Sequence, residues 1–488
     1  MVTKEKLIKN FSKAIHEGYA AIFAGAGLSR SAGFVDWKTL LRPLAEEISL
    51  DVDKENDLLA VAQYNLNEHG TRSGINQSIM ESFTKEVQIN ENIRILTRLP
   101  INTYWTTNYD ELLEEGFKEN NRRLDVKVTK DQLAISLPDR DAVLYKMHGD
   151  VKNPAEAVLT KDDYVKYDKN RPMFNTVLKG DLISKTFLFI GFSFEDPNLD
   201  YVLSRIYVLL DGNGRDHYCF FKRVKHDDFN SDEDYLYHKV KEELKEKDLK
   251  RYGIQTIFVN EYSEIPDILK EIEKAVSLAN VFISGSVSGY STPWDACSAE
   301  SLGFHLAKNL VHKDYKIYSG FGYGLGSSII NGALDEIYSS KYRHLDEHLC
   351  MRPFPQGITD ADERKSLYTK YRNEMISEVG IVVIMFGNKK DSSGNLVVAD
   401  GCVEEFLIAK ELGKIIIPIG ATGYAAAQIL TGINADIKMY PYLEKYIHKL
   451  NTELDISRII KLMISQIPTL YTPKKGSSLA SHVSFSVH

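Results

Sequence analysis

The sequence predicts an α/β protein with two domains, each built on a mainly parallel sheet. Three observations support this prediction. Short apolar runs alternate with helical patterns, which is typical of parallel strands joined by crossover helices. A glycine-rich turn directly follows an early apolar run, and the same arrangement returns after residue 280. The length of 488 residues is sufficient for two large domains.

The composition excludes several classes of protein. A net charge of −8 and a pI of about 6.0 argue against a general nucleic-acid binder. The four cysteines are far apart in the sequence, so we expect no metal site and no disulfide scaffold. Residues 1–18 are charged and helical in pattern rather than a signal peptide, and Pro418 and Gly420 interrupt the apolar stretch 415–433. We therefore expect a cytoplasmic protein without a membrane span.

The first predicted domain covers residues 1–277 and alternates strands with helices. Its expected strands are Ala20–Ala24, Thr103–Thr106, Ala142–Met147, Thr186–Gly191, His217–Phe221 and Thr256–Val259. Residues 222–250 are dense in Lys, Asp and Glu, which indicates a solvated helical excursion. A helix over Ile265–Leu278 closes the domain.

The second predicted domain covers residues 278–473 and starts with a new strand and glycine turn. Its expected strands are Val281–Ile283, Lys316–Ser319, Gly380–Phe386 and Lys414–Ile419. Helices are expected over Ala296–Lys313, Ser328–Tyr338 and Val403–Leu412. The pattern predicts a second Rossmann-like unit. The Ser-rich tail, residues 474–488, is expected to be disordered.

The first glycine turn lies in residues 21–34, AIFAGAGLSRSAGF. Gly25-Ala26-Gly27 follows a strand, and Leu28-Ser29-Arg30 is expected to open a helix. Backbone N–H groups of such a turn can approach a pyrophosphate. The turn alone is equally typical of a structural glycine turn that binds no ligand, and it does not distinguish a redox cofactor from a dinucleotide substrate.

Polar residues follow two further strands, in YWTTNYD (104–110) and YKMHGD (145–150). Asn108 and Asp110 come after one strand, and His148 ends the other. Ligands of open α/β sheets bind at the carboxyl ends of strands, and a histidine there can act as a general base. Taken singly, an Asx turn and a structural histidine are the commoner interpretations.

Two later strands end in comparable signals, FIGFSFEDPN (189–198) and TIFVNEY (256–262). In this order and spacing, GAGLS, TTNYD, HG, GFS…DP and VN together resemble the sirtuin catalytic domain over most of residues 15–262. The resemblance implies an NAD⁺ site in which Asn108 and His148 act at the nicotinamide ribose. The residues that it implies for binding NAD⁺ are Gly25, Ala26, Gly27, Ser29, Asp36, Asp110, Gly191, Ser193 and Asn260.

The sequence departs from the protein-deacylating sirtuins in two ways. It lacks their four-cysteine zinc module, and their PDFR-like motif is replaced by Val35-Asp36-Trp37-Lys38. Without a groove for an acyl-lysine peptide, water can capture the ribose, so we expect hydrolysis of NAD⁺ to nicotinamide and ADP-ribose. A protein deacylase or ADP-ribosyltransferase and a non-catalytic nucleotide sensor stay open as alternatives.

The second domain carries its own loop with four glycines, SGFGYGLGS (319–327), before a helix. Downstream, Arg372 and Lys389 could pair with phosphates, and Glu405, expected at a helix start, could accept from a ribose hydroxyl. Each of these residues alone is more typical of a surface charge or a helix cap. Together they resemble the nucleotide-sensing SLOG family, without the PGGxGT-type motif of its phosphoribohydrolase members, which favours sensing over catalysis. The candidate ligand residues are Gly285, Ser286, Gly322, Gly324, Gly326, Ser327, Arg372, Lys389 and Glu405.

A sirtuin-like domain followed by a SLOG domain resembles the effectors of bacterial Thoeris antiphage systems. The resemblance implies an enzyme that depletes NAD⁺, which is its substrate rather than a cofactor. It also implies activation by a cyclic ADP-ribose isomer from a partner TIR-domain protein, and a homo-oligomer, expected to be a tetramer.

Overall fold

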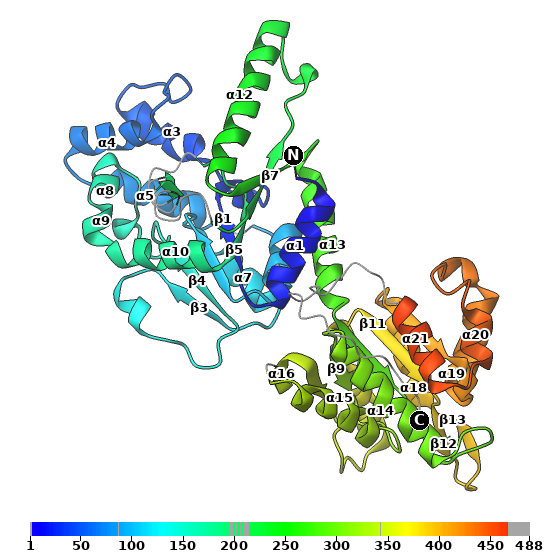
Figure 1. Cartoon of the computed structure of the whole chain (residues 1–488). Coiled ribbons are helices and arrows are strands. Elements are labelled where there is room, and N and C mark those ends of the chain that lie inside the picture. The colour runs from blue at the N-terminus through cyan, green and yellow to red at the C-terminus, as the bar shows by residue number, and fades with distance from the viewer. Residues whose placement is uncertain are drawn as a thin grey trace. The chain divides into compact units, whose positions relative to one another are not determined.

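The computed structural model of the chain describes residues 2–85, 87–194, 199–200, 203–204, 207, 214–341 and 343–466 (Figure 1). The chain divides into two compact units, Met1–Glu273 and Lys274–His488. The boundary expected after residue 277 lies four residues beyond this division, at the end of helix α13 (Ile265–Ser277). Residues 195–198 of the GFS…DP motif and the tail 474–488 lie outside the described residues.

The first unit contains a seven-stranded sheet in the order β3-β4-β2-β1-β5-β6-β7, with every neighbouring pair parallel. Its strands are β1 (Ala20–Ala24), β2 (Thr103–Thr106), β3 (Leu124–Lys127), β4 (Ala142–Lys146), β5 (Thr186–Ile190), β6 (His217–Lys222) and β7 (Ile254–Val259). The central strands β1, β2 and β5 are buried along their whole length, which explains their continuous apolar sequences.

The sequence reading missed β3, whose sequence LDVK alternates apolar and charged residues. The structure places β3 at the edge of the sheet, where Lys127 pairs with Asp125 at 2.7 Å and Arg140 pairs with the same carboxylate at 2.7 Å. An edge strand needs fewer apolar residues than a central one, so its pattern is weaker in the sequence.

Helices cover this sheet and extend from it. They are α1 (Lys4–His16), α2 (Ala26–Arg30), α3 (Trp37–Glu47), α4 (Leu58–His69), α5 (Ser73–Phe83), α6 (Glu91–Arg98), α7 (Leu112–Glu119), α8 (Lys161–Val165), α9 (Tyr167–Asn170), α10 (Pro172–Ser184), α12 (Asp232–Arg251) and α13. Helices α3, α4 and α5 share a small hydrophobic core that includes Leu41, Val61 and Ile79. The predicted excursion over 222–250 is confirmed as a helix only from Asp232 onward, where Ser231 caps the first turn.

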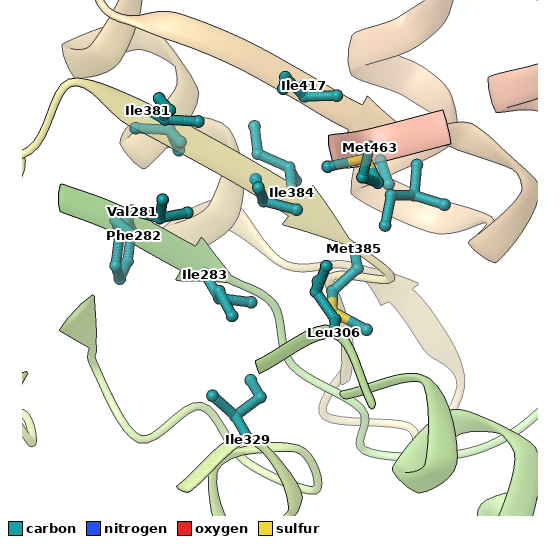
Figure 2. Close-up of a cluster of buried hydrophobic side chains, with 14 of the residues drawn as sticks. Val281, Phe282, Ile283, Leu306, Ile329, Ile381, Ile384, Met385, Ile417 and Met463 are labelled. Atoms are coloured by element: carbon teal, nitrogen blue, oxygen red, sulfur yellow. The ribbon is translucent and has the colours of Figure 1, made fainter. Parts of the chain in front are cut away.

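The second unit has a five-stranded parallel sheet in the order β10-β9-β8-β11-β14, beside a short antiparallel hairpin. Its strands are β8 (Asn280–Ser284), β9 (Lys316–Ser319), β10 (Leu349–Met351), β11 (Ile381–Met385) and β14 (Ile415–Ile419), with β12 (Asn388–Lys390) and β13 (Leu396–Val398) in the hairpin. Figure 2 shows side chains of β8, β11 and β14, such as Ile283, Ile384 and Ile417, packed in one core with Leu306 and Met463.

The helices of the second unit follow the strands in alternation. They are α14 (Ala296–His312), α15 (Gly326–Ser339), α16 (Leu345–His348), α17 (Ala361–Ser377), α18 (Asp400–Glu411), α19 (Tyr424–Ala435), α20 (Ile447–Thr452) and α21 (Ile456–Gln466). Both units therefore have the predicted α/β architecture with parallel sheets. Of the helices that the structure describes, none has the length and apolar character needed to cross a bilayer.

Candidate functional site

The strand order of the first unit creates a switch point between β1 and β5. Strands β2, β4 and β3 lie on one side of β1, and strands β6 and β7 lie on the far side of β5. Loops after such a pair of strands diverge, and ligands of open α/β sheets bind in the crevice between them. The loops at this point are Gly25-Ala26-Gly27 after β1 and Gly191 after β5.

These two loops touch through their backbones. Gly27 N–H donates to Gly191 O at 2.8 Å, and Gly25 N–H donates to Ile190 O at 2.9 Å. A Cβ on Gly25 would lie 2.4 Å from Gly191 O, and one on Gly191 would lie 2.2 Å from Leu28 N. Gly191 also has φ of +67°, which L-residues avoid. The glycines let the loops approach each other, and a phosphate could bind the two N–H groups only after these hydrogen bonds break.

A chain of side-chain hydrogen bonds links the first loop to the end of β2. Asn108 Nδ2 donates to Ser29 Oγ at 2.8 Å and to Gly25 O at 3.0 Å, and Ser29 Oγ donates to Asp110 Oδ2 at 2.6 Å. Helix α2 begins at Ala26, two residues before the predicted opening, and this start places Ser29 on the buried side facing Asp110. Burial raises the pKa of the Asp110 carboxyl, although the Ser29 hydrogen bond opposes this shift.

The amide oxygen of Asn108 is the second notable feature of this network. Oδ1 is buried and accepts no hydrogen bond from any described residue, whereas both acceptors of its Nδ2 group are in place. The side chains of Ser29, Asn108 and Asp110 line a cavity of about 10 Å³, which has room for one water molecule. A buried acceptor without a donor is costly, so this oxygen is available to a water or a ligand hydroxyl.

Behind this network lies a buried cation that the sequence reading missed. Lys146, at the end of β4, is 0% exposed. Its Nζ contacts Asp150 Oδ2 at 2.6 Å and Glu114 Oε1 at 2.9 Å, and it donates to the backbone oxygen of Asp110 at 2.7 Å. Burial lowers the pKa of Lys146, but the two carboxylates outweigh burial and hold the pKa above its ordinary value. Lys146 thus ties the Asn108 loop to the loop that carries His148.

The sequence did contain a signal for this cluster. A lysine inside the apolar run AVLYK of a buried strand requires a counter-charge, and Asp150 follows four residues later in the same motif. The second carboxylate, Glu114, comes from helix α7 and is brought close only by the strand order.

His148 follows β4, as predicted, and its side chain is also 0% exposed. The rings of Tyr164 and Tyr167 lie edge-on to the imidazole, with centroids at 5.5 and 6.2 Å. The His148 carbonyl accepts from Val158 N–H at 2.8 Å. In this conformation a dinucleotide can reach the imidazole only if the covering residues move.

The remaining predicted NAD⁺ residues are spread along the same edge of the sheet. Ala26 is half-buried in the first loop, and the exposed Ser193 follows Gly191. Asp36 caps helix α3 by accepting from Thr39 N–H at 2.9 Å. Asn260 is exposed after β7, four strand positions from β2, or roughly 19 Å away.

The second unit has a corresponding switch point between β8 and β11. Gly285 and Ser286 follow β8, and Ser286 Oγ donates to Asn388 O at 3.0 Å. A Cβ on Gly322 would lie 1.9 Å from Gly285 O, and one on Gly324, where φ is +75°, would lie 2.2 Å from Val287 O. These two glycines therefore let the β9 loop pack against the β8 loop. Gly326 is the first residue of α15, and Ser327 next to it is exposed.

Two of the charged residues predicted for this unit, Arg372 and Glu405, meet at the end of β8. Arg372 contacts Glu404 Oε2 at 2.8 Å and Glu405 Oε1 at 3.4 Å, and its guanidinium lies 4.9 Å from the centre of the Phe354 ring. Ser284 Oγ, at the end of β8, donates to Glu405 Oε2 at 2.5 Å. Lys389, in β12, forms an ion pair with Asp400.

The expectation that Glu405 stands at a helix start is wrong. Helix α18 begins at Asp400, so Glu405 lies in its second turn, where it is buried. Burial raises the pKa of its carboxyl, although Ser284 and Arg372 oppose the shift. Glu405 is therefore neither a surface charge nor a cap.

Comparison with known proteins identifies both units. Residues 102–257 match the family model described as "SIR2-like domain", and residues 264–470 match the "Sir2- and TIR-associating SLOG family". The chain is similar to proteins named "NAD(+) hydrolase ThsA" from three bacteria. It is 46% identical to the one from Bacillus cereus (strain MSX-D12), over 96% of this chain and 98% of that protein.

The other two comparisons are of the same kind. Identity is 47% to the protein from Cytobacillus dafuensis, over 86% of each chain, and 43% to the one from Acinetobacter baumannii (strain 532279), over 92% and 95%. With near-complete coverage at this identity, and with a SIR2-like unit followed by a SLOG unit, this chain belongs to the NAD(+) hydrolase ThsA family.

Proposed function

We propose that the first unit hydrolyses NAD⁺ to nicotinamide and ADP-ribose at the β1–β5 switch point, and that a cyclic ADP-ribose isomer bound to the second unit controls this activity. The observation that carries the proposal is the buried amide oxygen of Asn108, which accepts no hydrogen bond from the described residues and lines a small cavity next to the glycine loop. Family membership supports the reaction, because the relatives that match are named for it.

The reaction needs few chemical groups. The bond between nicotinamide and ribose breaks with its electron pair going to the nicotinamide nitrogen, which leaves positive charge at the anomeric carbon. Water then adds to that carbon and loses a proton. Asn108 Oδ1 can accept a hydrogen bond from that water or from a ribose hydroxyl, and a neutral His148 can accept the proton.

The arrangement of the site supports a low resting activity. The N–H groups of Gly25 and Gly27 are hydrogen-bonded, His148 is covered, and a cavity of about 10 Å³ cannot hold a dinucleotide. An activator shifts such a balance only by binding the open state more tightly, typically by about 1–3 kcal/mol per site. A homo-oligomer, for which we propose a tetramer, would couple several such sites and sharpen the response.

The β8–β11 switch point of the second unit is the proposed activator site. Arg372 and Lys389 would bind phosphates there, and Glu405 would accept from a ribose hydroxyl. Arg372 already contacts Glu404, so an incoming phosphate would have to displace this carboxylate. The family description that includes TIR association supports a TIR-domain protein as the source of the ligand. The biological outcome would be antiphage defence through loss of cellular NAD⁺.

The first experiment measures free nicotinamide released from NAD⁺ by the purified full chain, with and without a panel of cyclic ADP-ribose isomers. We expect release that rises with one isomer and is abolished in Asn108→Ala and His148→Ala. Asn67→Ala, which removes an exposed amide from α4, serves as the matched control. Full release by His148→Ala, or none from the native chain with any isomer, would refute the hydrolase mechanism. Acyl-ADP-ribose or a modified protein as product would favour the transferase alternatives.

The second experiment tests the activator site by titrating the activating isomer. Arg372→Ala is expected to abolish the response, whereas Arg458→Ala, an exposed arginine on α21, should respond like the native chain. Glu404→Gln should lower the half-activating concentration severalfold, because the amide no longer competes for Arg372 as a charge. A normal response of Arg372→Ala would show that the activator binds elsewhere.

A further inference from the structure

Helix α12 of the first unit carries an apolar stripe that the described part of this unit leaves exposed. Leu236, Val240 and Leu244 are 59%, 55% and 60% exposed. They are spaced at four-residue intervals, so they lie along one side of the helix. A run of large exposed aliphatic side chains on a soluble protein indicates a binding surface rather than a solvated face.

The other sides of α12 are fixed by contacts within the unit. Glu242 is buried and accepts from Val224 N–H at 2.8 Å and from Arg223 Nη1 at 3.1 Å, and Leu249 belongs to the hydrophobic core. Phe229 stacks on His238 with centroids 4.7 Å apart. At 100° per residue, Val240 lies about 160° around the helix from Glu242, so the stripe faces away from the body of the unit. Figure 1 shows α12 extending beyond the sheet.

Opposite charges stand at the two ends of the stripe. Glu233 lies three residues before Leu236, and Lys247 lies three residues after Leu244. Both side chains are exposed, and neither forms an ion pair with another residue in the described part of the chain. The series 233, 236, 240, 244, 247 is symmetric about residue 240, with an acidic residue at one end and a basic residue at the other.

We propose that α12 pairs with α12 of a second copy of this chain, antiparallel and about a two-fold axis at Val240. The reversed copy would place Leu236 against the partner's Leu244 and Glu233 against the partner's Lys247. A two-fold interface requires a surface that is complementary to itself. This stripe meets that requirement, because apolar side chains would face apolar side chains and each acidic end would face a basic end. Antiparallel helices also bring the acidic first turn of one near the carboxyl end of the other, which the helix dipoles favour.

Self-complementarity is the reason to choose a second copy over a different protein. A stripe made for another partner has no need of opposite charges at equal distances from its centre. The proposal adds a specific surface to the expected homo-oligomer, and its tests do not depend on NAD⁺ hydrolysis.

The first test uses disulfide formation, because the two-fold axis brings residue 240 next to itself. Val240→Cys is made in a Cys297→Ser background, which removes the exposed native thiol. We expect it to form a reducible cross-linked dimer at least ten times faster than Lys241→Cys, which is exposed on the same helix but about 100° off the stripe. Equal rates for the two variants, or no cross-link in either, would overturn the proposal.

The second test uses charge reversal in the full chain. Glu233→Lys and Lys247→Glu should each weaken association, because each places like charges opposite one another, and the double variant should restore it. Sedimentation velocity at fixed concentration would show the mass falling about twofold in each single variant and returning in the double. A double variant no better than the singles would exclude the pairing, and capture of a different protein by an intact monomer would identify another occupant.

Discussion

Replacing Lys146 by methionine should destabilise the first unit strongly while changing almost no volume. The substitution removes the cation that lies 2.6 Å from Asp150 and 2.9 Å from Glu114 and leaves both carboxylates without it. Breaking a buried ion pair from one side costs about 3–5 kcal/mol. The Glu114 side chain retains 18% exposure and can be partly hydrated, so we expect the lower end, about 3 kcal/mol.

Scanning calorimetry of the full chain measures this effect as a fall in Tm. A loss of about 3 kcal/mol corresponds to a fall in Tm of roughly 6–12 °C for a domain of this size. Lys152→Met is the matched control, since Lys152 pairs with Glu111 at the surface and is 71% exposed, so the pair contributes about 0–1 kcal/mol. If Lys146→Met lowered Tm no more than Lys152→Met, the buried cluster would not hold the loops as argued.

Three further predictions concern other buried or constrained positions. Burial lowers the pKa of His217 to about 4, below its unfolded value near 6.5, so the stability from its neutral ring is present above pH 6.5 and lost as pH falls towards 4. The free energy of unfolding, measured by urea titration at each pH, should fall by about 3 kcal/mol over this range. His217→Gln should reduce this dependence on pH, and an unchanged dependence in the variant would contradict the assignment to His217. Gly191→Ala should abolish nicotinamide release or folding of the first unit, because its Cβ would meet Leu28 N at 2.2 Å; native-like release and melting would refute this. Gly180→Ala, inside α10 with nothing within 4 Å, should instead stabilise by about 0.5–1 kcal/mol in the same calorimetric scan, and destabilisation would be the contrary result.

Much of the fold was predictable because its strands are buried on both faces. The bounds of β1, β2 and β9 are those expected from their apolar runs, and Asn108 and His148 do follow β2 and β4. The strands missed were β3, β10 and the β12–β13 hairpin, which are edge strands or hairpin strands of only three or four residues, too short to show a periodic pattern.

The site was less predictable, because its contacts depend on which strands become neighbours. The sequence did not reveal that Gly25, Gly27 and Gly191 allow two loops to approach each other. Glu114, the second carboxylate at Lys146, and Glu404, which contacts Arg372, each lie on a helix 32 residues away in the sequence, so no local spacing reveals them.

The contact between Arg372 and Glu404 has a consequence for the binding of unrelated anions at Arg372. Because the fold holds Glu404 beside Arg372, its carboxylate competes with free anions at an effective concentration on the order of millimolar or above. Abundant small anions that offer a single charge would exchange one ion pair for another and gain little. Under the proposed function, only a molecule that makes several contacts at once would displace Glu404 from Arg372, so this carboxylate would set the threshold for activation.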